Sequence, residues 1–321
     1  MDLGDLADVG SPPHHGPAVQ VRGLEVAFGT HRALAGIDLT VPDGAVVALL
    51  GPNGAGKTTT VRVLTTLLRP TAGTARVAGL DVVRDAARVR GLIAVTGQET
   101  SLDGRLTGRE MLRMMARLRR LPRVAGRARV EEVLEAFDLA DAAGRRIGTW
   151  SGGMQRRLDI AAGLLVRPRV LFLDEPTTGL DPRARRSVWD LVGSVAARGT
   201  TVVLTTQYLE EAEQLADEIV VVDAGRVVAR GTAGALKRRV GGATVEVEVR
   251  GEAVPRRYAT DGTVGDARRI LAHLEDTAIP VERWSLREPT MDDVFLALTG
   301  VPSGGGTSAR RAPSAARTEE R

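Results

Sequence analysis

A glycine-rich loop between an apolar strand and a helix constrains this chain more than any other feature. Residues 45–50 (AVVALL) predict a buried strand, residues 51–58 (GPNGAGKT) fit the phosphate-binding pattern G-x-x-x-x-G-K-[ST], and a helix is expected over 57–68. Glycines let such a loop curl until several N–H groups point at one anion. A chance glycine turn is the alternative, and the strand and helix on either side argue against it. The expected nucleotide-binding residues here are Gly51, Pro52, Asn53, Gly54, Ala55, Gly56, Lys57, Thr58 and Thr59.

Within this loop the two last polar residues have distinct expected roles. Lys57 would reach the β- and γ-phosphates, and the Thr58 hydroxyl would hold Mg²⁺. Lysine occurs only at positions 57 and 237, whereas the other 42 basic residues are arginine. A loop that needs a thin stem and a compact ammonium would explain a lysine in so arginine-rich a chain, although chance would explain it too.

A second apolar strand ends in two carboxylates. Residues 171–175 (LFLDE) predict a buried strand that presents Asp174 to Mg²⁺ at the carboxyl edge of a sheet. Glu175, the next residue, could orient and deprotonate an attacking water molecule. A merely solvated acidic pair is the simpler alternative, but it is disfavoured beside a phosphate-binding loop. The sequence therefore predicts ATP hydrolysis with Mg²⁺, with Glu175 as the catalytic base.

The charge balance argues against a nucleic-acid partner despite a pI of about 10.2. The net charge is +4, from 44 basic and 40 acidic residues, and the segment 301–321 contributes +2 of it. The pI is high because cysteine is absent and lysine and tyrosine are scarce, so little titrates between pH 7 and 10. No nucleic-acid binding is therefore expected.

Composition also limits the cellular setting. No apolar stretch approaches the roughly 20 residues needed to cross a bilayer, and residues 1–16 lack the apolar region of a signal peptide. The chain is therefore expected in the cytosol, with any membrane work done through a partner. The absence of cysteine excludes disulfides, thiolate metal sites and a cysteine nucleophile.

The turn Ser151-Gly152-Gly153-Met154-Gln155 lies 23 residues before Asp174 and is followed by a helix-like segment. A serine hydroxyl and glycine amides at a helix N-terminus form a second anion site. In this position the motif resembles the signature of ABC transporter ATPases. The resemblance implies that Ser151, Gly152, Gly153 and Gln155 face the γ-phosphate bound by a second subunit, so a homodimer would enclose two ATP molecules.

The resemblance to ABC ATPases extends over residues 19–235 and implies further site residues. Gln98 matches the glutamine that touches Mg²⁺ and senses the membrane subunit. Asp181, in Gly179-Leu180-Asp181, matches a segment that contacts the opposite active site. Phe28 lies where the family places an aromatic ring on adenine, and a phenylalanine packed in the core is the alternative.

Position 207 departs from the family pattern. ABC ATPases usually have a histidine there that contacts the γ-phosphate, whereas this chain has Gln207 after the predicted strand 201–205. A glutamine amide can still donate a hydrogen bond to phosphate, but it cannot carry a proton. Gln207 is thus expected to assist catalysis, and hydrolysis by Glu175 is expected to survive the substitution.

The fold class that follows is α/β, a P-loop NTPase of the ABC type. It is expected to have a mostly parallel sheet, an antiparallel β part, a helical insertion and a small α+β appendage at the C-terminal end. The expected divisions are a disordered leader (1–16), the ATP-binding domain (17–238) with its helical insertion (about 105–150), the appendage (239–300) and a disordered tail (301–321).

The expected elements follow hydrophobic periodicity and capping signals. Thr107 and Glu110 form a capping box, which predicts a helix from 107 to 121. Asp181 followed by Pro182 predicts a helix that ends near Gly199. The other expected strands are 19–27, 169–173, 201–205, 218–222, 243–249 and 281–286, and the other expected helices are 130–137, 266–275 and 291–298.

Three segments resemble the daunorubicin/doxorubicin-resistance ATP-binding proteins: 95–98 (VTGQ), 205–217 (TTQYLEEAEQLAD) and 291–300 (MDDVFLALTG). The last could equally be an amphipathic helix that closes the appendage. The resemblance implies a peripheral subunit on the cytoplasmic face of the membrane, which energises a separate ABC-2 type permease for multidrug or antibiotic efflux. The helical insertion is expected to touch that permease, or else to be only a packing module.

Two other functions remain open at this point. One is a non-transport ABC ATPase that acts on nucleic acid or ribosomes, which the weak basicity and the absence of long coiled coils disfavour. The other is a resistance protein that binds ATP without hydrolysing it, which Asp174, Glu175 and Gln98 together disfavour.

Overall fold

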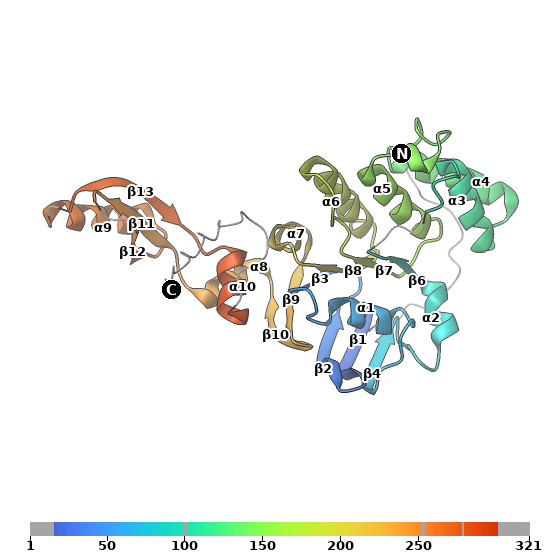
Figure 1. The fold of residues 1–321 in the computed structure, drawn as a ribbon, viewed down its shortest axis with the longest axis horizontal. Helices are drawn as coiled ribbons and strands as arrows, with labels where there is room; N and C mark the ends of the chain where they lie inside the picture. Colours follow the sequence, from blue (N-terminus) through green and yellow to red (C-terminus); the bar gives the residue numbers. More distant parts are fainter. Residues whose placement is uncertain (1–15, 99–101, 252–253, 278, 301–321) are drawn as a thin grey trace, which may run out of the picture.

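The computed structural model describes residues 16–98, 102–251, 254–277 and 279–300, and they form three sheets with helices around them (Figure 1). The predicted tail and all of the predicted leader except Gly16 lie outside the described residues. None of the helices in these four ranges is long and apolar enough to cross a membrane.

The central sheet has six strands in the order β10-β9-β3-β8-β7-β6. All neighbouring pairs are parallel except β10 with β9, which confirms the predicted parallel pairing. Every residue of β3 and β7 is buried. Helices α5 (Gly152–Gly163) and α6 (Pro182–Ala196) cover one face of the sheet, while α1 (Lys57–Leu64) and a second sheet cover the other (Figure 1). The strands are β3 (Val46–Leu50), β6 (Ile93–Thr96), β7 (Val170–Asp174), β8 (Thr201–Thr206), β9 (Glu218–Asp223) and β10 (Arg226–Gly231).

Alternate residues of the central strands belong to two different cores, as strand geometry requires. In β3, Ala48 and Leu50 belong to the core shared with α5 and α6, while Val47 and Leu49 belong to the core under the second sheet. That second sheet is antiparallel, in the order β2-β1-β4-β5. Its strands are β1 (Val19–Phe28), β2 (His31–Val41), β4 (Ala72–Val77) and β5 (Leu80–Asp81), of which only β1 was predicted.

Helix α1 (Lys57–Leu64) ends four residues before the predicted end at 68. Thr65 donates its hydroxyl to the Val61 carbonyl, and Thr66 has a φ of +66°, so the chain leaves the helical conformation there. The prediction of a longer helix was wrong. Leu67 and Leu68 extend the apolar pattern of the sequence, but they lie beyond the end of α1.

The helical insertion contains α3 (Gly108–Leu118) and α4 (Arg123–Ala136), and it leads into α5 (Gly152–Gly163). The predicted capping box is present, since Thr107 and Glu110 each bond the other's backbone N–H. Helix α4 begins seven residues before the predicted start at 130. Gly126 is buried in this first part of α4, where an added Cβ would lie 3.3 Å from Leu121 Cβ and 3.6 Å from Ala116 Cβ.

The remaining helices of the ATP-binding region surround the central sheet. α6 (Pro182–Ala196) follows β7, as predicted, and Asp181 caps it through the Ala184 N–H at 2.9 Å. α2 (Ala86–Leu92), α7 (Leu209–Leu215) and α8 (Ala233–Val240) were not predicted.

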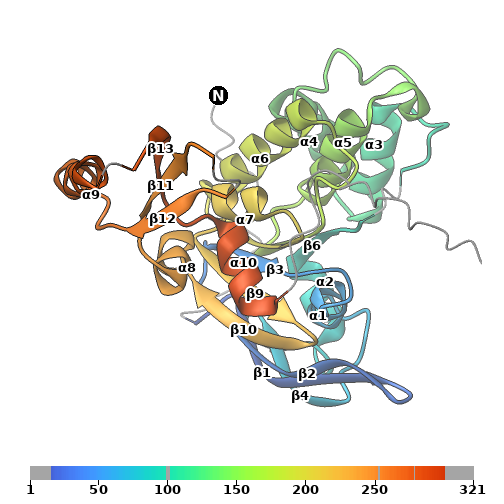
Figure 2. The ribbon, with the colours of Figure 1, turned by 60° about the vertical axis from the view of Figure 1, so that its left-hand side comes forward.

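The C-terminal part forms a small three-stranded sheet in the order β12-β11-β13, packed on helix α9. Its elements are β11 (Thr244–Val249), β12 (Arg256–Ala259), α9 (Val264–Asp276) and β13 (Val281–Arg287). Helix α10 (Met291–Thr299) then returns to lie against α8 and α7 (Figures 1 and 2). Its buried residues Met291, Val294 and Phe295 belong to the main core, so α10 does not close the small core of the appendage.

Candidate nucleotide-binding and hydrolysis site

Three neighbouring parallel strands bring the predicted site residues to one edge of the central sheet. β8 lies between β3 and β7, with Leu50 paired to Thr206 and Asp174 paired to Thr205. The glycine loop, Glu175 and Gln207 follow directly after these strands, so they leave the sheet side by side. Ligands of parallel α/β sheets bind at this carboxyl edge.

The glycine loop, residues 51–56, leads into a helix N-terminus that no side chain caps. Among the described residues, the N-cap residue Gly56 offers no side-chain cap to the N–H groups of the first turn of α1, and that turn contains no acidic residue. Gly56 has a φ of +105°, and a Cβ there would lie 2.7 Å from Leu34 Cδ2, so only glycine fits. The backbone N–H groups of this turn can therefore receive an anion.

Lys57 extends back over the loop that precedes it. Its ammonium donates to the carbonyls of Gly51 at 2.8 Å and Pro52 at 3.0 Å, and it lies 3.6 Å from Glu175 Oε1. Burial lowers the pKa of Lys57, and the neighbouring Glu175 carboxylate opposes that change. A positive charge thus lies between the loop that would hold phosphate and the carboxylate that would activate water.

Asp174 ends β7 and accepts two hydroxyl hydrogen bonds on Oδ1. Thr58 Oγ1 donates at 3.1 Å and Thr205 Oγ1 at 2.5 Å. The described residues contain no group of three His, Cys, Asp or Glu that could hold a metal alone. A magnesium ion held by one hydroxyl, one carboxylate, nucleotide phosphates and water needs no such group, and these oxygen donors suit it.

Glu175 is held in an unusual backbone conformation and oriented by several neighbours. Its φ is +48°, which for a non-glycine residue costs about 1–3 kcal/mol. Its N–H donates to the Thr205 carbonyl and hydroxyl, at 3.1 and 3.0 Å. Its Oε2 accepts from Gln98 Nε2 and Thr178 Oγ1, both at 3.2 Å. Gln98, predicted to touch Mg²⁺, therefore has its amide on the candidate base.

The signature turn forms the N-terminus of α5. Ser151 is the N-cap residue, and its hydroxyl accepts from the Met154 N–H at 3.3 Å. Gly153 lies against the first turn of α6, where an added Cβ would be 2.8 Å from Ala184 Cβ. In the described part of the chain, no hydrogen bond or ion pair joins residues 151–153 to the glycine loop. The two candidate anion sites of one chain are therefore not joined by a hydrogen bond or an ion pair.

Two residues predicted to contact nucleotide or the opposite site, Gln155 and Asp181, have hydrogen-bond partners within their own chain. The Gln155 amide donates to the carbonyls of Ile147 at 3.1 Å and Trp150 at 3.3 Å, which holds the loop before the signature turn. The Asp181 carboxylate caps its own helix, α6. Both side chains stabilise the loop or turn beside the signature motif.

Gln207 is half-buried and follows directly after β8. Because β8 lies between β3 and β7, Gln207 leaves the sheet between the glycine loop, which follows β3, and Glu175, which follows β7. The residues on either side are fixed: the Tyr208 N–H donates to Thr206 Oγ1 at 2.9 Å, and the Arg185 guanidinium lies 4.5 Å from the Tyr208 ring centre. The backbone on either side of Gln207 is therefore held in place at the carboxyl end of β8.

Replacing Gln207 tests what an uncharged amide contributes. The variant Gln207→Ala is expected to lower the rate of phosphate release by less than about tenfold, since a single neutral hydrogen bond contributes about 0.5–1.5 kcal/mol. Gln207→His is expected to add a titration step near pH 6.5 that the wild type lacks. A wild-type step at that pH that disappears in Gln207→Ala would contradict this assignment, and unchanged turnover in Gln207→Ala would make the residue only structural.

Phe28 is 52% exposed at the end of β1, so the alternative of a core position is wrong. An exposed ring at this position is available to stack on a base. The remaining predicted residues of the loop region differ in exposure: Ala55 is buried, Pro52 and Thr59 are half-buried, and Asn53 and Gly54 are exposed.

Two residues of the site were not predicted. Thr205 bonds both Asp174 and Glu175, but in the sequence it is only one more β-branched residue of a strand. Arg156 lies behind Glu175 and donates to three main-chain carbonyls. One arginine among the 42 of this chain gives no signal in the sequence, and only its burial distinguishes it.

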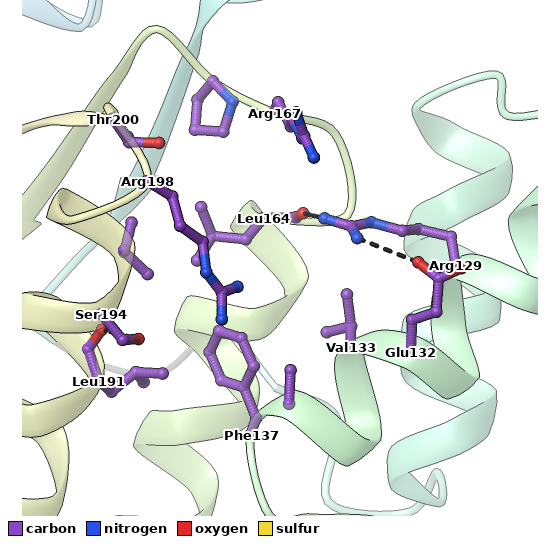
Figure 3. Close-up of a pocket in the computed structure, with 13 residues that line it drawn as sticks. Arg129, Glu132, Val133, Phe137, Leu164, Arg167, Leu191, Ser194, Arg198 and Thr200 are labelled. Atoms are coloured by element: carbon purple, nitrogen blue, oxygen red, sulfur yellow. Dashed lines mark hydrogen bonds and ion pairs between the residues drawn. The ribbon is translucent and has the colours of Figure 1, made fainter. Parts of the chain in front are cut away.

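A cavity of about 460 Å³ lies apart from these residues, between α4, α5 and α6 (Figure 3). No predicted site residue lines it. Arg129 crosses one wall and donates to the Leu164 and Leu165 carbonyls at the end of α5. The cavity therefore lies where α4, α5 and α6 pack together, and Arg129 joins α4 to the end of α5 across it. The lining consists of Arg129, Glu132, Val133, Ala136, Phe137, Leu164, Arg167, Pro168, Leu191, Ser194, Val195, Arg198 and Thr200.

The fold and the residues at the sheet edge define a P-loop nucleotide hydrolase. A sequence profile described as ABC transporter matches residues 34–178. A daunorubicin resistance ATP-binding protein of Streptomyces coeruleorubidus is 52% identical over 88% of this chain and 96% of its own length. A doxorubicin resistance ATP-binding protein of Mycobacterium tuberculosis is 44% identical over 89% of this chain and 95% of its own. The chain belongs to the ATP-binding proteins of ABC transporters.

A solved structure agrees with this assignment. The ATP-binding subunit of an ABC transporter is 29% identical, has a TM-score of 0.62, and covers 69% of this chain and 92% of its own. The predicted family, the predicted P-loop NTPase fold and the predicted ATPase activity are thus confirmed.

Proposed function

We propose that this chain is the ATP-hydrolysing subunit of an exporter whose membrane-spanning part is a separate permease of the ABC-2 type. The observation that carries the proposal is the cluster of Lys57, Asp174, Glu175 and Gln98 at one sheet edge. In the described part of the chain, the signature turn makes no hydrogen bond or ion pair with this cluster. The cluster supports hydrolysis. The separate turn supports action on a second copy of the chain.

In the proposed reaction, the loop and Lys57 bind the β- and γ-phosphates of ATP. Mg²⁺, held by Thr58 and Asp174, would supply charge neutralisation at the phosphates. Glu175 accepts the proton of the attacking water as the water oxygen bonds the γ-phosphorus, and the bond from that phosphorus to the bridging oxygen breaks to release ADP. Gln98 and Thr178 keep the Glu175 carboxylate oriented. Two copies would enclose two nucleotides, each with the loop of one copy and residues 151–153 of the other.

The permease is proposed to dock on the helical insertion. Apolar side chains there are exposed: Leu118 of α3 is 69% exposed and Val124 of α4 is 84% exposed. Exposed apolar groups on a monomer often mark an interaction site. Docking there would place this subunit at the cytoplasmic face of the membrane as a peripheral protein.

The cargo is proposed from the relatives. Two are named for daunorubicin or doxorubicin resistance, and a Nod factor export ATP-binding protein of Ralstonia nicotianae is 38% identical over 88% of this chain. Multidrug or antibiotic efflux is therefore proposed here. Expression of this chain with and without a candidate ABC-2 type permease, in a drug-sensitive host, tests this: equal drug accumulation in the two hosts would contradict efflux.

The variant Leu118→Asp/Val124→Asp is expected to lose most of its co-purification with the membrane fraction while the purified protein still hydrolyses ATP. The reason is that two carboxylates would be desolvated in the interface. Leu67→Asp, at a 71% exposed position just after α1, is the matched control and is expected to leave membrane recovery unchanged. Quantitative recovery of ribosomes or DNA instead of a permease would favour the non-transport alternative and contradict the exporter.

A further inference from the structure

Arg156 of helix α5 has a buried guanidinium that bonds two separate segments of the catalytic edge. Nε donates to the Pro176 carbonyl at 2.8 Å, and Nη2 donates to the Asp174 carbonyl at 3.1 Å. Nη1 donates to the Gly97 carbonyl at 2.5 Å, just after β6. Its side chain is only 5% exposed.

The three carbonyls are next to the residues that would perform hydrolysis. Asp174 and Pro176 are the residues before and after Glu175, and Gly97 precedes Gln98, which donates to the Glu175 carboxylate. A strained residue such as Glu175 keeps its conformation only where its surroundings fix it. Arg156 holds the main chain on both sides of Glu175, through the carbonyls of Asp174 and Pro176. It also holds the carbonyl of Gly97, the residue before the hydrogen-bond donor Gln98.

The ion pair of Arg156 is secondary to these bonds. Asp159, one turn further along α5, lies 3.6 Å from Nη1, which is beyond hydrogen-bond distance. Burial raises the pKa of Asp159 to about 6, and Arg156 opposes that rise. A planar guanidinium can donate in three directions to fixed carbonyls, whereas an ammonium of lysine cannot match that geometry.

Arg156 also connects this edge to the other anion site, because α5 begins with the signature turn. Ser151 caps the helix five residues before Arg156, and Gly153 lies in its first turn. A displacement of the N-terminal end of α5 would therefore move a side chain that is bonded to the main chain around Glu175.

We propose that Arg156 is a positioning residue for ATP hydrolysis: it aligns Glu175 and Gln98, and it couples them to the signature end of its own helix. This rests on the proposed roles of Glu175 and residues 151–153. Through it, nucleotide bound at the signature turn by a partner subunit affects the base in this subunit's own site.

The test compares Arg156→Met with Arg157→Met in steady-state phosphate release over a range of ATP concentrations. Arg157 is the neighbour on the same helix and also bonds a carbonyl, that of Phe137 at 3.1 Å, but not the catalytic edge. Arg156→Met is expected to lower kcat by about 10- to 100-fold with KM for ATP within about threefold of wild type, since small displacements of a reacting group have effects of that size. Arg157→Met is expected to retain kcat within about threefold.

Three further variants separate the possible explanations. Asp159→Asn removes the ion pair but leaves the three carbonyl bonds, so it is expected to keep near-wild-type kcat. If Arg156→Met does not fold, Arg156→Lys carries the same expectation, a lower kcat at unchanged KM.

The comparison of Glu175→Gln with the wild type tests the proposed function, because it measures whether Glu175 is needed for phosphate release. Equal kcat for Arg156→Met and wild type, with Glu175→Gln inactive, would overturn the positioning role alone. An equal loss in Arg156→Met and Asp159→Asn would also overturn it.

Discussion

The variant Glu175→Gln is expected to lose phosphate release by about 10²- to 10⁴-fold while it still binds ATP. That range is the usual contribution of a positioned general base. Glutamine keeps the shape of the side chain and an oxygen that can accept from Gln98 and Thr178, but it cannot accept the proton of the attacking water. Steady-state phosphate release and equilibrium binding of a fluorescent ATP analogue measure the two properties separately.

Glu210→Gln is the matched control for this experiment. Glu210 is exposed in the first turn of α7, close in sequence to the catalytic edge but with no part in the proposed chemistry. The rate of phosphate release by Glu210→Gln is expected to match that of the wild type. Equal rates for Glu175→Gln and wild type would remove Glu175 from the role of base.

Lys57→Ala is expected to weaken ATP binding by about 30- to 5,000-fold. The loss of a buried, hydrogen-bonded charge opposite a phosphate typically costs about 2–5 kcal/mol. Lys57 is 4% exposed and already lies between the loop carbonyls and Glu175, so its removal would also leave that carboxylate beside the phosphates without a counter-charge. Titration with a fluorescent ATP analogue measures the change.

Lys237→Ala is a close control because it replaces the only other lysine of the chain. Lys237 lies in α8 and pairs with Glu213, away from the sheet edge. ATP affinity of this variant is expected to equal that of the wild type. An unchanged affinity in Lys57→Ala would refute the proposed mode of phosphate binding.

The parts of the site that depend on local chemistry were predictable from the sequence. The loop needs glycine where φ is positive, a buried parallel strand reads as an aliphatic run, and Thr107 with Glu110 marks a helix start. Parallel strands then place Asp174 and the loop at one edge without further information. Each of these features requires particular residue types at particular positions, so the sequence displays the requirement directly.

The features that depend on tertiary contacts were not predictable. β2 and β4 are stabilised by pairing with β1, so their sequences carry little signal of their own. The packing of α10 on the main core depends on residues distant in the sequence. The hydrogen bond from the Gln155 amide to the Ile147 carbonyl depends on the conformation of an irregular loop. Arg156 is recognisable only once its three carbonyl partners are seen.

The mass of the Glu175→Gln variant in solution with saturating Mg-ATP tests the two-subunit site most directly. In the proposed arrangement, the phosphate loop of one chain and the signature turn of a second copy together form a complete site. The account predicts a particle of twice the chain's 34.0 kDa with ATP, and a monomer without nucleotide. A monomer under both conditions would contradict it.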